Sequence, residues 1–222
     1  MAGSINSPRS FITLEGPDGA GKSTQQRLLV DRIAALGRGV IATREPGGTD
    51  FGEQVRRVLL QSSSEHDALA DALLFSAARR QLVETVIAPA LERGEVVVCD
   101  RYADSTLAYQ GYGAGVDLGT LRMLAAVATA GLTPTRTLLL DLPVATGLAR
   151  RHSGSTSDLT RFETGSTHDV AFHERVRAGF LGLAADEPER WRIIDASHDT
   201  ETVAIDVWAA VEDLFWERAD RP

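Results

Sequence analysis

The stretch that decides the fold is Gly16-Pro17-Asp18-Gly19-Ala20-Gly21-Lys22-Ser23, which fits the pattern G-x-x-x-x-G-K-[ST]. A short apolar run from Phe11 to Leu14 precedes it and suits a buried strand, and Thr24 to Leu36 repeats apolar side chains at helical spacing. A strand that enters a glycine-rich loop and then a helix turns several backbone N–H groups toward one point, at the positive end of the helix dipole. The sequence therefore predicts that residues 16–23 bind a nucleoside triphosphate.

Two side chains of this loop have specific roles in the predicted site. Lys22 supplies a mobile positive charge for the β- and γ-phosphates, and the Ser23 hydroxyl is a candidate ligand for Mg²⁺. The alternative is a chance match in a tight turn. The strand before the loop and the helix after it argue against that alternative, because this context gives the motif its mechanical meaning.

Five short apolar runs predict buried strands, with helical stretches between them. They are Phe11–Glu15, Val40–Thr43, Val96–Cys99, Thr137–Asp141 and Trp191–Asp195. The runs lack polar alternation, as expected where helices cover both faces of a sheet, and parallel strands need long crossovers of this kind. The predicted fold class is α/β, a five-stranded parallel sheet of the P-loop NTPase type flanked by helices.

Two longer helical patterns complete the prediction. Residues Asp67 to Glu92 form one, with an interruption or bend near Pro89. The final helix is predicted from about Thr200 to Arg218, with one buried stripe made by Val203, Val207, Val211 and Leu214.

Composition limits the classes of partner. The 222 residues suit one domain, residues 11–222, after a loose polar arm at residues 1–10. A net charge of −8 argues against nucleic acid or an anionic membrane surface as partner, and no apolar stretch of about 18 residues is present to span a membrane. Cys99 is the single cysteine, which excludes an internal disulfide and fits a cytoplasmic protein. We expect Cys99 to be a small buried hydrophobe and not a nucleophile.

One segment lacks the apolar pattern of the predicted strands and helices. His152 to Thr167 is rich in Ser, Thr and Gly and poor in large apolar side chains; Arg150 and Arg151 stand at its start, and Arg161 lies inside it. This composition predicts a mobile loop at about residues 150–167. Arginines on such a loop suggest a lid that closes over reacting phosphates. From spacing alone, a solvated surface loop remains an equal alternative.

Two clusters follow predicted strands, where ligands of open α/β sheets bind. After the second strand, Pro46-Gly47-Gly48 forces an irregular turn and presents Arg44 beyond the sheet. Arg101 ends the third strand and suits a phosphate, as a forked donor. The alternatives are that the glycines serve only a turn and that Asp100 and Arg101 form a local ion pair.

A third cluster is helical. Phe75 and Arg79 are four residues apart and share a face, as do Ser105 and Tyr109. An aromatic ring beside a forked donor suits a planar heterocycle with carbonyl acceptors. The alternative is that Phe75 belongs to the core and Arg79 is an exposed helix residue.

With these stretches in one order, the chain resembles thymidylate kinases of the bacterial type, a family of P-loop nucleoside monophosphate kinases. The matching stretches are FITLEGPDGAGKST from Phe11, TREPGGT from Thr43, LLFSAAR from Leu73, DRYADSTLAYQGYG from Asp100 and, in the predicted lid, DLTRFE from Asp158. The resemblance implies transfer of the γ-phosphoryl group of ATP to dTMP, giving dTDP and ADP with Mg²⁺. It also implies a homodimer packed through helices.

The resemblance assigns the base and sugar of dTMP by position. Phe75 would stack on thymine and Arg79 would bond its carbonyl edge. Ser105 would contact the base, and Tyr109 would crowd the sugar 2′ position and so favour deoxyribose. Gln110 would lie near the base or the sugar.

The resemblance also assigns the phosphates. Arg101 would grip the acceptor phosphate with Arg44 in support, and Asp18 would approach the sugar 3′-hydroxyl. Gly19 stands where some members carry a catalytic arginine, so Arg150 and Arg161 are expected to supply that charge. Arg151 is expected to contact ATP.

Two other functions remain open. A deoxynucleoside kinase would phosphorylate the 5′-hydroxyl and would need a carboxylate base where this chain has Glu15 and Asp18. A nucleotide-binding regulator without catalysis would bind but not turn over, although the retained Lys22 and Ser23 argue against it.

Overall fold

The computed structural model describes residues 10–61, 66–152 and 170–216. Its centre is a sheet of five parallel strands in the order β2-β3-β1-β4-β5. The strands are β1 (Phe11–Glu15), β2 (Val40–Arg44), β3 (Val96–Asp100), β4 (Arg136–Asp141) and β5 (Trp191–Asp195). The predicted five-stranded parallel sheet is confirmed, and each predicted strand end lies within one residue of the observed one.

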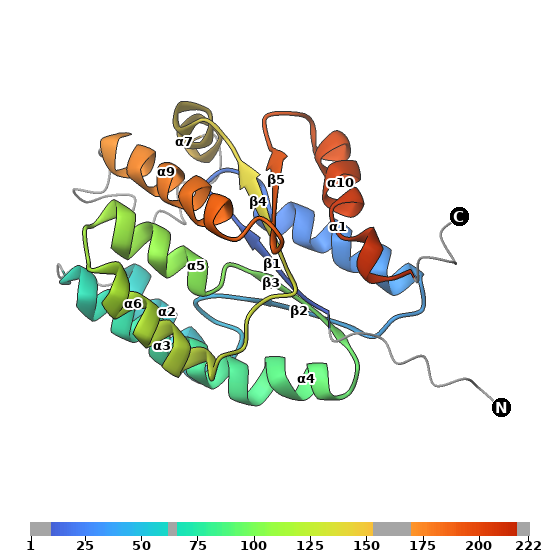
Figure 1. Ribbon diagram of the computed structural model, residues 1–222, viewed down its shortest axis with the longest axis horizontal. Coiled ribbons are helices and arrows are strands. Elements are labelled where there is room, and N and C mark those ends of the chain that lie inside the picture. The colour runs from blue at the N-terminus through green and yellow to red at the C-terminus, as the bar shows by residue number, and fades with distance from the viewer. Residues whose placement is uncertain (1–9, 62–65, 153–169, 217–222) are drawn as a thin grey trace.

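Helices cover both faces of the sheet, as Figure 1 shows. On one face lie α1 (Lys22–Ala35) and α10 (Thr200–Ala209), which pack together with the strands into one core cluster. On the other face lie α3 (Ala68–Leu82), α4 (Ala88–Glu92), α5 (Ala103–Thr106) and α9 (Val170–Asp186). The helices α2 (Asp50–Gln61) and α6 (Leu118–Thr129) pack against α3, and α7 (Val144–His152) follows β4.

The first long helical prediction is confirmed with its interruption near Pro89, and the second is partly wrong. The pattern from Asp67 to Glu92 is interrupted before Pro89, by a π-helical turn η1 (Val83–Ile87) between α3 and α4. Pro89 stands in the first turn of α4, where its missing N–H leaves no helical bond unmade. The final helix ends at Ala209, and a 3-10 turn η5 (Glu212–Leu214) follows it.

The strand order places the chemistry. Because β1 lies between β3 and β4, the loop that leaves β1 emerges at the centre of the sheet. In the register of β1 and β3, Leu14 pairs with Asp100, so Glu15 and Arg101 leave neighbouring strand ends. A second π-helical segment, η2 (Leu107–Gly113), continues α5 and packs on α9.

The core matches the strand predictions. Every residue of β1 is buried, as expected for a central strand covered on both faces. Cys99 is fully buried and donates to the carbonyl of Arg101, and burial raises the pKa of its thiol. The expectation that Cys99 packs as a small hydrophobe is confirmed.

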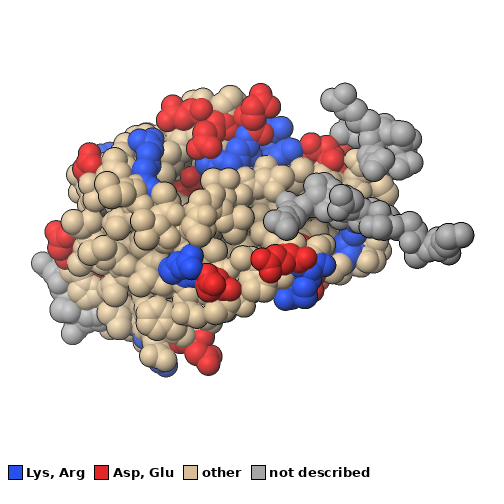
Figure 2. Space-filling model, turned by 60° about the horizontal axis from the view of Figure 1, so that its bottom comes forward, with Lys and Arg blue, Asp and Glu red and all other residues tan. Residues whose placement is uncertain are grey.

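Charged side chains are mixed on the face that Figure 2 shows. Positive and negative groups lie there in small neighbouring clusters, separated by broad uncharged areas. Within the described part of the chain, no helix is both long enough and apolar enough to cross a bilayer.

Candidate functional site

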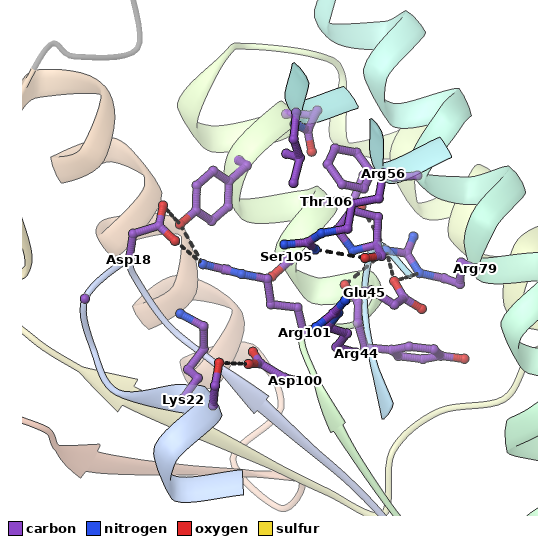
Figure 3. A pocket seen from close by; sticks show the side chains of 18 of the residues that line it. Asp18, Lys22, Arg44, Glu45, Arg56, Arg79, Asp100, Arg101, Ser105 and Thr106 are labelled. Carbon is purple, nitrogen blue, oxygen red and sulfur yellow. Dashed lines mark hydrogen bonds and ion pairs between the residues drawn. The ribbon is translucent and has the colours of Figure 1, made fainter. Parts of the chain in front are cut away.

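A cavity of about 390 Å³ lies at the carboxyl ends of β1, β2 and β3. Figure 3 shows Asp18 and Lys22 on one side of it, Glu45 and Arg79 on the other, and Arg101 between them. Most of the predicted site residues line this one cavity: Asp18, Gly19, Gly21, Lys22, Ser23, Arg44, Phe75, Arg79, Arg101, Ser105, Tyr109 and Gln110.

Some predicted site residues are not brought to the cavity. Gly16, Pro17 and Ala20 belong to the loop but do not line the hollow. Arg150 donates to the backbone carbonyls of Ala196 (2.8 Å) and Ser197 (3.1 Å), in the turn between β5 and α10. Arg161 and most of the predicted lid lie outside the described residues, as does the side chain of Arg151.

Lys22 is folded back over the loop that it follows. Its Nζ donates to the carbonyl oxygens of Gly16 (3.1 Å) and Pro17 (2.8 Å), and the side chain is almost fully buried. Burial, with the positive charge of Arg101 adding to it, lowers the pKa of Lys22 to about 8. Lys22 is therefore a cation whose charge is less stable than that of an ordinary lysine, and a bound anion would favour the charged form.

The glycine loop touches the start of α7 through backbone alone. Gly19 has φ +79°, and a Cβ built on it would lie 2.3 Å from the carbonyl oxygen of Gly147. A Cβ on Gly147 would in turn lie 2.6 Å from the carbonyl oxygen of Asp18. A side chain at position 19 would therefore collide with the backbone of α7, so the position suits glycine.

Ser23 and Asp100 bring two oxygen ligands together. The Ser23 hydroxyl donates to Oδ2 of Asp100 at 2.6 Å, from the first turn of α1 to the end of β3. Oxygen donors of this kind suit Mg²⁺, which keeps several waters and takes few protein ligands. Among the described residues, no cluster of three or more His, Cys, Asp or Glu forms a protein-only metal site. The residues present thus fit a metal that is shared with bound phosphates.

The guanidinium of Arg101 forms hydrogen bonds to three side chains that line the cavity. Its Nη2 donates to Oδ1 of Asp18 at 2.7 Å and to the Tyr109 hydroxyl at 3.1 Å, and its Nη1 donates to the Ser105 hydroxyl at 3.0 Å. Its backbone is left-handed, with φ +69°. The alternative of a local Asp100–Arg101 ion pair is wrong, because the guanidinium pairs with Asp18 instead.

The Ser105 hydroxyl is already engaged on both sides. It donates to Oε2 of Glu15 at 2.5 Å and accepts from Arg101. Its expected contact with a base stays a prediction, and that contact would use the acceptor lone pair that these two bonds leave.

Arg79 is buried and precisely held, so the alternative of an exposed helix residue is wrong. It is 1% exposed, and its Nε donates to Oε2 of Glu45 at 2.8 Å. Its Nη2 donates to the Tyr102 carbonyl and to the Thr106 hydroxyl, each at 3.1 Å. Its Nη1 is buried and has no hydrogen-bond partner among the described residues. Such an unpaired donor is costly unless a ligand satisfies it.

The Glu45–Arg79 pair is a part of the site that the sequence motifs did not reveal. Glu45 follows β2 within TREPGGT, and its peptide bond to Pro46 is cis. Burial raises the pKa of Glu45, and the neighbouring guanidinium of Arg79 opposes the increase. A carboxylate in a turn at the end of a strand is a signal that a cationic partner lies nearby. The sequence does not identify that partner, because Arg79 is 34 residues away.

Arg56 is a second residue that was missed. It lies on α2, lines the cavity and donates to the Pro46 carbonyl at 2.9 Å. Burial and the positive charge of Arg44 lower its pKa. No motif marks it, since its amphipathic helix gives an arginine no particular meaning.

Glu15 does not serve as the base of a deoxynucleoside kinase. It is fully buried and does not line the cavity, and both its oxygens accept protein hydrogen bonds, from the Tyr102 amide (2.7 Å) and from Ser105. The other candidate base, Asp18, is ion-paired with Arg101. A carboxylate in such a pair is a poor proton acceptor.

Comparison with known proteins agrees with this geometry. The family model for thymidylate kinase matches residues 14–207. The thymidylate kinase of Deinococcus radiodurans is 51% identical over 203 residues, covering 91% of this chain and 96% of the relative. The thymidylate kinase of Thermomicrobium roseum is 50% identical over 205 residues, covering 92% and 95%.

The fold has a solved counterpart. The crystal structure of thymidylate kinase from Ehrlichia chaffeensis superposes with a TM-score of 0.74 at 33% identity, covering 91% of this chain and 98% of that one. The likeness therefore extends over nearly the whole chain, in sequence and in three dimensions.

Proposed function

Since the chain belongs to the thymidylate kinase family, and so transfers the terminal phosphoryl group of ATP to dTMP, we propose that its two anionic substrates meet across Arg101. In this arrangement dTMP lies on the Phe75 and Arg79 side of the cavity, and the phosphates of ATP lie on the Lys22 side. Phosphoryl transfer needs little covalent help from the protein, so catalysis rests on alignment and charge neutralisation.

The observation that carries the base assignment is the unpaired Nη1 of Arg79. A carbonyl oxygen of thymine would satisfy this donor. Cytosine would place an amino group at the same position, and because that group is also a donor, Nη1 of Arg79 would stay unpaired. Phe75 lines the same cavity and would supply an aromatic face for the ring. Thr106 and Gln110 line it too and complete the polar border of the base site.

The acceptor phosphate would lie against arginines. Arg101 is anchored by Asp18 and Tyr109, so its guanidinium is oriented before a substrate arrives. Arg44 and Arg56 line the same cavity and add positive charge on its β2 side. Asp18 and Tyr109 would lie beside the sugar, with the Tyr109 ring restricting the 2′ position.

The donor phosphates would lie over the glycine loop. The backbone of Gly19 and Gly21 lines the cavity there, and Lys22 would leave its carbonyl contacts to neutralise the phosphates. Kinases of this family use ATP with a divalent cation, which we propose is Mg²⁺ held by Ser23 and Asp100. When bound, the cation spreads negative charge away from the phosphates.

Charge at the transferred group would come from further arginines. Arg150 and Arg161 are the predicted sources of it, within a predicted lid at about residues 150–167, and Arg151 is predicted to contact ATP. Arg150, on α7, donates to two carbonyls of the β5–α10 turn, so it would have to leave these contacts to reach the γ-phosphate. The cytoplasmic location and the loose arm at residues 1–10 also remain predictions.

We further propose that the chain forms a homodimer through α2, α3 and α6, which lie side by side in Figure 1. This face exposes apolar side chains that a monomer would leave in water, the largest fractions being 72% for Val127 and 68% for Met123 on α6. Phe51, Val58, Leu69 and Leu73 extend the same surface. Several exposed apolar side chains on neighbouring helices are typical of a protein interface.

Base recognition is tested by comparing dTMP, dCMP, dUMP and dGMP as acceptors for three forms of the enzyme. The wild type should prefer dTMP. Arg79→Ala should lower kcat/KM for dTMP about a hundredfold and narrow the preference over dCMP, because it removes a donor in a buried site. Arg80→Ala is the matched control, since Arg80 is the next residue and its ion pair among the described residues is an exposed one with Glu84. An equal loss in both variants, or a wild type without preference for dTMP, contradicts the assignment.

A further inference from the structure

Glu15 is a buried carboxylate that the proposed function leaves without a role. It ends β1 immediately before the glycine loop, is fully buried and does not line the cavity. Burying an ionisable group costs free energy unless its partners compensate. Burial, with a contribution from Asp104, raises the pKa of Glu15 to about 8. A group kept at such a cost at the base of an active site calls for an explanation.

Both oxygens of Glu15 lead to Arg101. Oε1 accepts the backbone N–H of Tyr102 at 2.7 Å, which is the peptide group directly after Arg101. Oε2 accepts the Ser105 hydroxyl at 2.5 Å, and that hydroxyl accepts Nη1 of Arg101 at 3.0 Å. One oxygen therefore holds the backbone on the carboxyl side of Arg101, and the other holds the end of its side chain.

The backbone that Glu15 holds is strained. Arg101 has φ +69°, a left-handed conformation that costs a residue with a Cβ about 1 kcal/mol or more. The Arg101 amide donates to the Leu14 carbonyl at 2.9 Å, so both peptide groups of Arg101 are tied to the end of β1. This conformation turns the guanidinium to Asp18, which lies only three residues after Glu15. The contacts close a ring from β1 through Ser105 and Arg101 to the glycine loop.

Two charged side chains act on Glu15, the carboxylate of Asp104 and the guanidinium of Arg101. Asp104, the carboxylate that acts on it, is held by two nitrogens of Arg190 at 2.7 and 3.2 Å. Arg101 is the cation whose charge favours the ionised form of Glu15. Asp104 is thus held by Arg190, and Glu15 faces Arg101 as the partner that it orients.

We propose that Glu15 is the positioning residue of the acceptor-phosphate site: it fixes the left-handed turn at Arg101 and, through Ser105, the direction of the Arg101 guanidinium. This inference rests on the proposed role of Arg101 in holding the dTMP phosphate. The ionised side chain accepts at both oxygens, whereas an amide accepts at only one, so the test is made at a pH above the raised pKa of Glu15. Glu15 contacts no substrate, so its effect reaches dTMP only through Ser105 and Arg101.

The test is a double-mutant cycle of Glu15→Gln and Ser105→Ala, measuring the dissociation constant of dTMP. Glu15→Gln keeps an acceptor for the Tyr102 amide and removes the acceptor for Ser105. Each single variant should weaken dTMP binding about tenfold, because each breaks the same charge-assisted chain. The dissociation constant of dTMP for the double variant should be within about twofold of that for the weaker-binding single variant. Both substitutions break the same series of hydrogen bonds, so the second adds little to the first. KM for ATP and the unfolding midpoint are measured on the same samples.

Three outcomes overturn the inference. They are an unchanged dTMP affinity in Glu15→Gln, additive losses in the double variant, and a loss of stability with no loss of dTMP affinity. If Glu15→Gln does not fold, Glu15→Asp enters the same cycle, because it keeps the charge and withdraws it by one methylene. Arg101→Ala separates the two proposals. If it leaves dTMP binding intact, the phosphate assignment fails; if it weakens binding while Glu15→Gln does not, only the role of Glu15 fails.

Discussion

Lys22 is the only lysine in a chain that otherwise uses arginine for all its basic side chains. The difference matters because a lysine loses its proton readily when it is buried, whereas an arginine does not. Lys22 lies among the carbonyl oxygens of Gly16 and Pro17, and burial lowers its pKa to about 8. The charge of Lys22, which is expected to contact the phosphates, therefore depends on whether an anion is bound.

This yields a prediction for pH dependence. Below pH 8 the free enzyme carries the charged Lys22, and above pH 8 it progressively loses that charge. Hence kcat/KM for ATP, which reports the free enzyme, should fall about tenfold per pH unit above pH 8, while the fall in kcat should occur at higher pH because bound phosphates favour the ammonium form. Protein labelled with ¹³C-lysine gives a single Lys22 signal, so its Cε shift measures the pKa directly. A pKa near the ordinary 10.5 would contradict the account.

At the scale of elements, the contact between the glycine loop and α7 decides what the loop can carry. Gly19 and Gly147 meet backbone to backbone, and a Cβ on Gly19 would lie 2.3 Å from the Gly147 oxygen. The loop therefore keeps a left-handed glycine and has no room for an arginine. Any further positive charge for the phosphates has to come from another element, which is why the predictions for Arg150, on α7, and Arg161, later in the chain, matter.

We predict that Gly19→Ala destabilises the protein more than Gly37→Ala does. Gly37 has φ +73° with nothing within 4 Å of a built Cβ, so its variant carries only the left-handed strain, about 1 kcal/mol. Gly19→Ala adds a backbone clash and should cost about 3 kcal/mol in the free energy of unfolding. Urea unfolding measures both, and KM for ATP should rise only in Gly19→Ala. Equal destabilisation would show that the loop and α7 can separate.

The sequence predicted the strands well because each is a short continuous apolar run between turns, the pattern that a doubly covered parallel strand requires. It predicted the helices less well. The π-helical turn from Val83 to Ile87 contains ordinary helix-compatible residues, so nothing local distinguishes it. The end of α10 at Ala209 has no proline or glycine to mark it.

The site shows the same division. Residues inside motifs, such as Lys22 and Arg101, were found because their neighbours define their surroundings. Other features of the site depend on contacts between segments far apart in the chain. They are the Glu45–Arg79 pair, the position of Arg56 and the hydrogen bond from Ser105 to Glu15, which spans 90 residues. A single sequence carries no record of those contacts.

At the scale of the whole molecule, the apolar face of α2, α3 and α6 predicts the oligomeric state. Met123→Glu or Val127→Glu should convert a dimer into a monomer, because each places a charge in the proposed interface. Ile205→Glu on α10 is the matched control: Ile205 is 64% exposed but lies on the opposite face of the sheet. Light scattering after size exclusion gives the masses. Dimers throughout, or a monomeric wild type, would contradict the proposed interface.

The central claim is that dTMP lies between the Phe75 and Arg79 wall and the guanidinium of Arg101. A crystal structure of the complex with dTMP and a non-hydrolysable ATP analogue tests it most directly. It should show the thymine ring against Phe75, a thymine oxygen bonded to Nη1 of Arg79, and the dTMP phosphate on Arg101 facing Lys22. A dTMP molecule bound elsewhere, or one in this cavity whose phosphate does not touch Arg101, would contradict the claim.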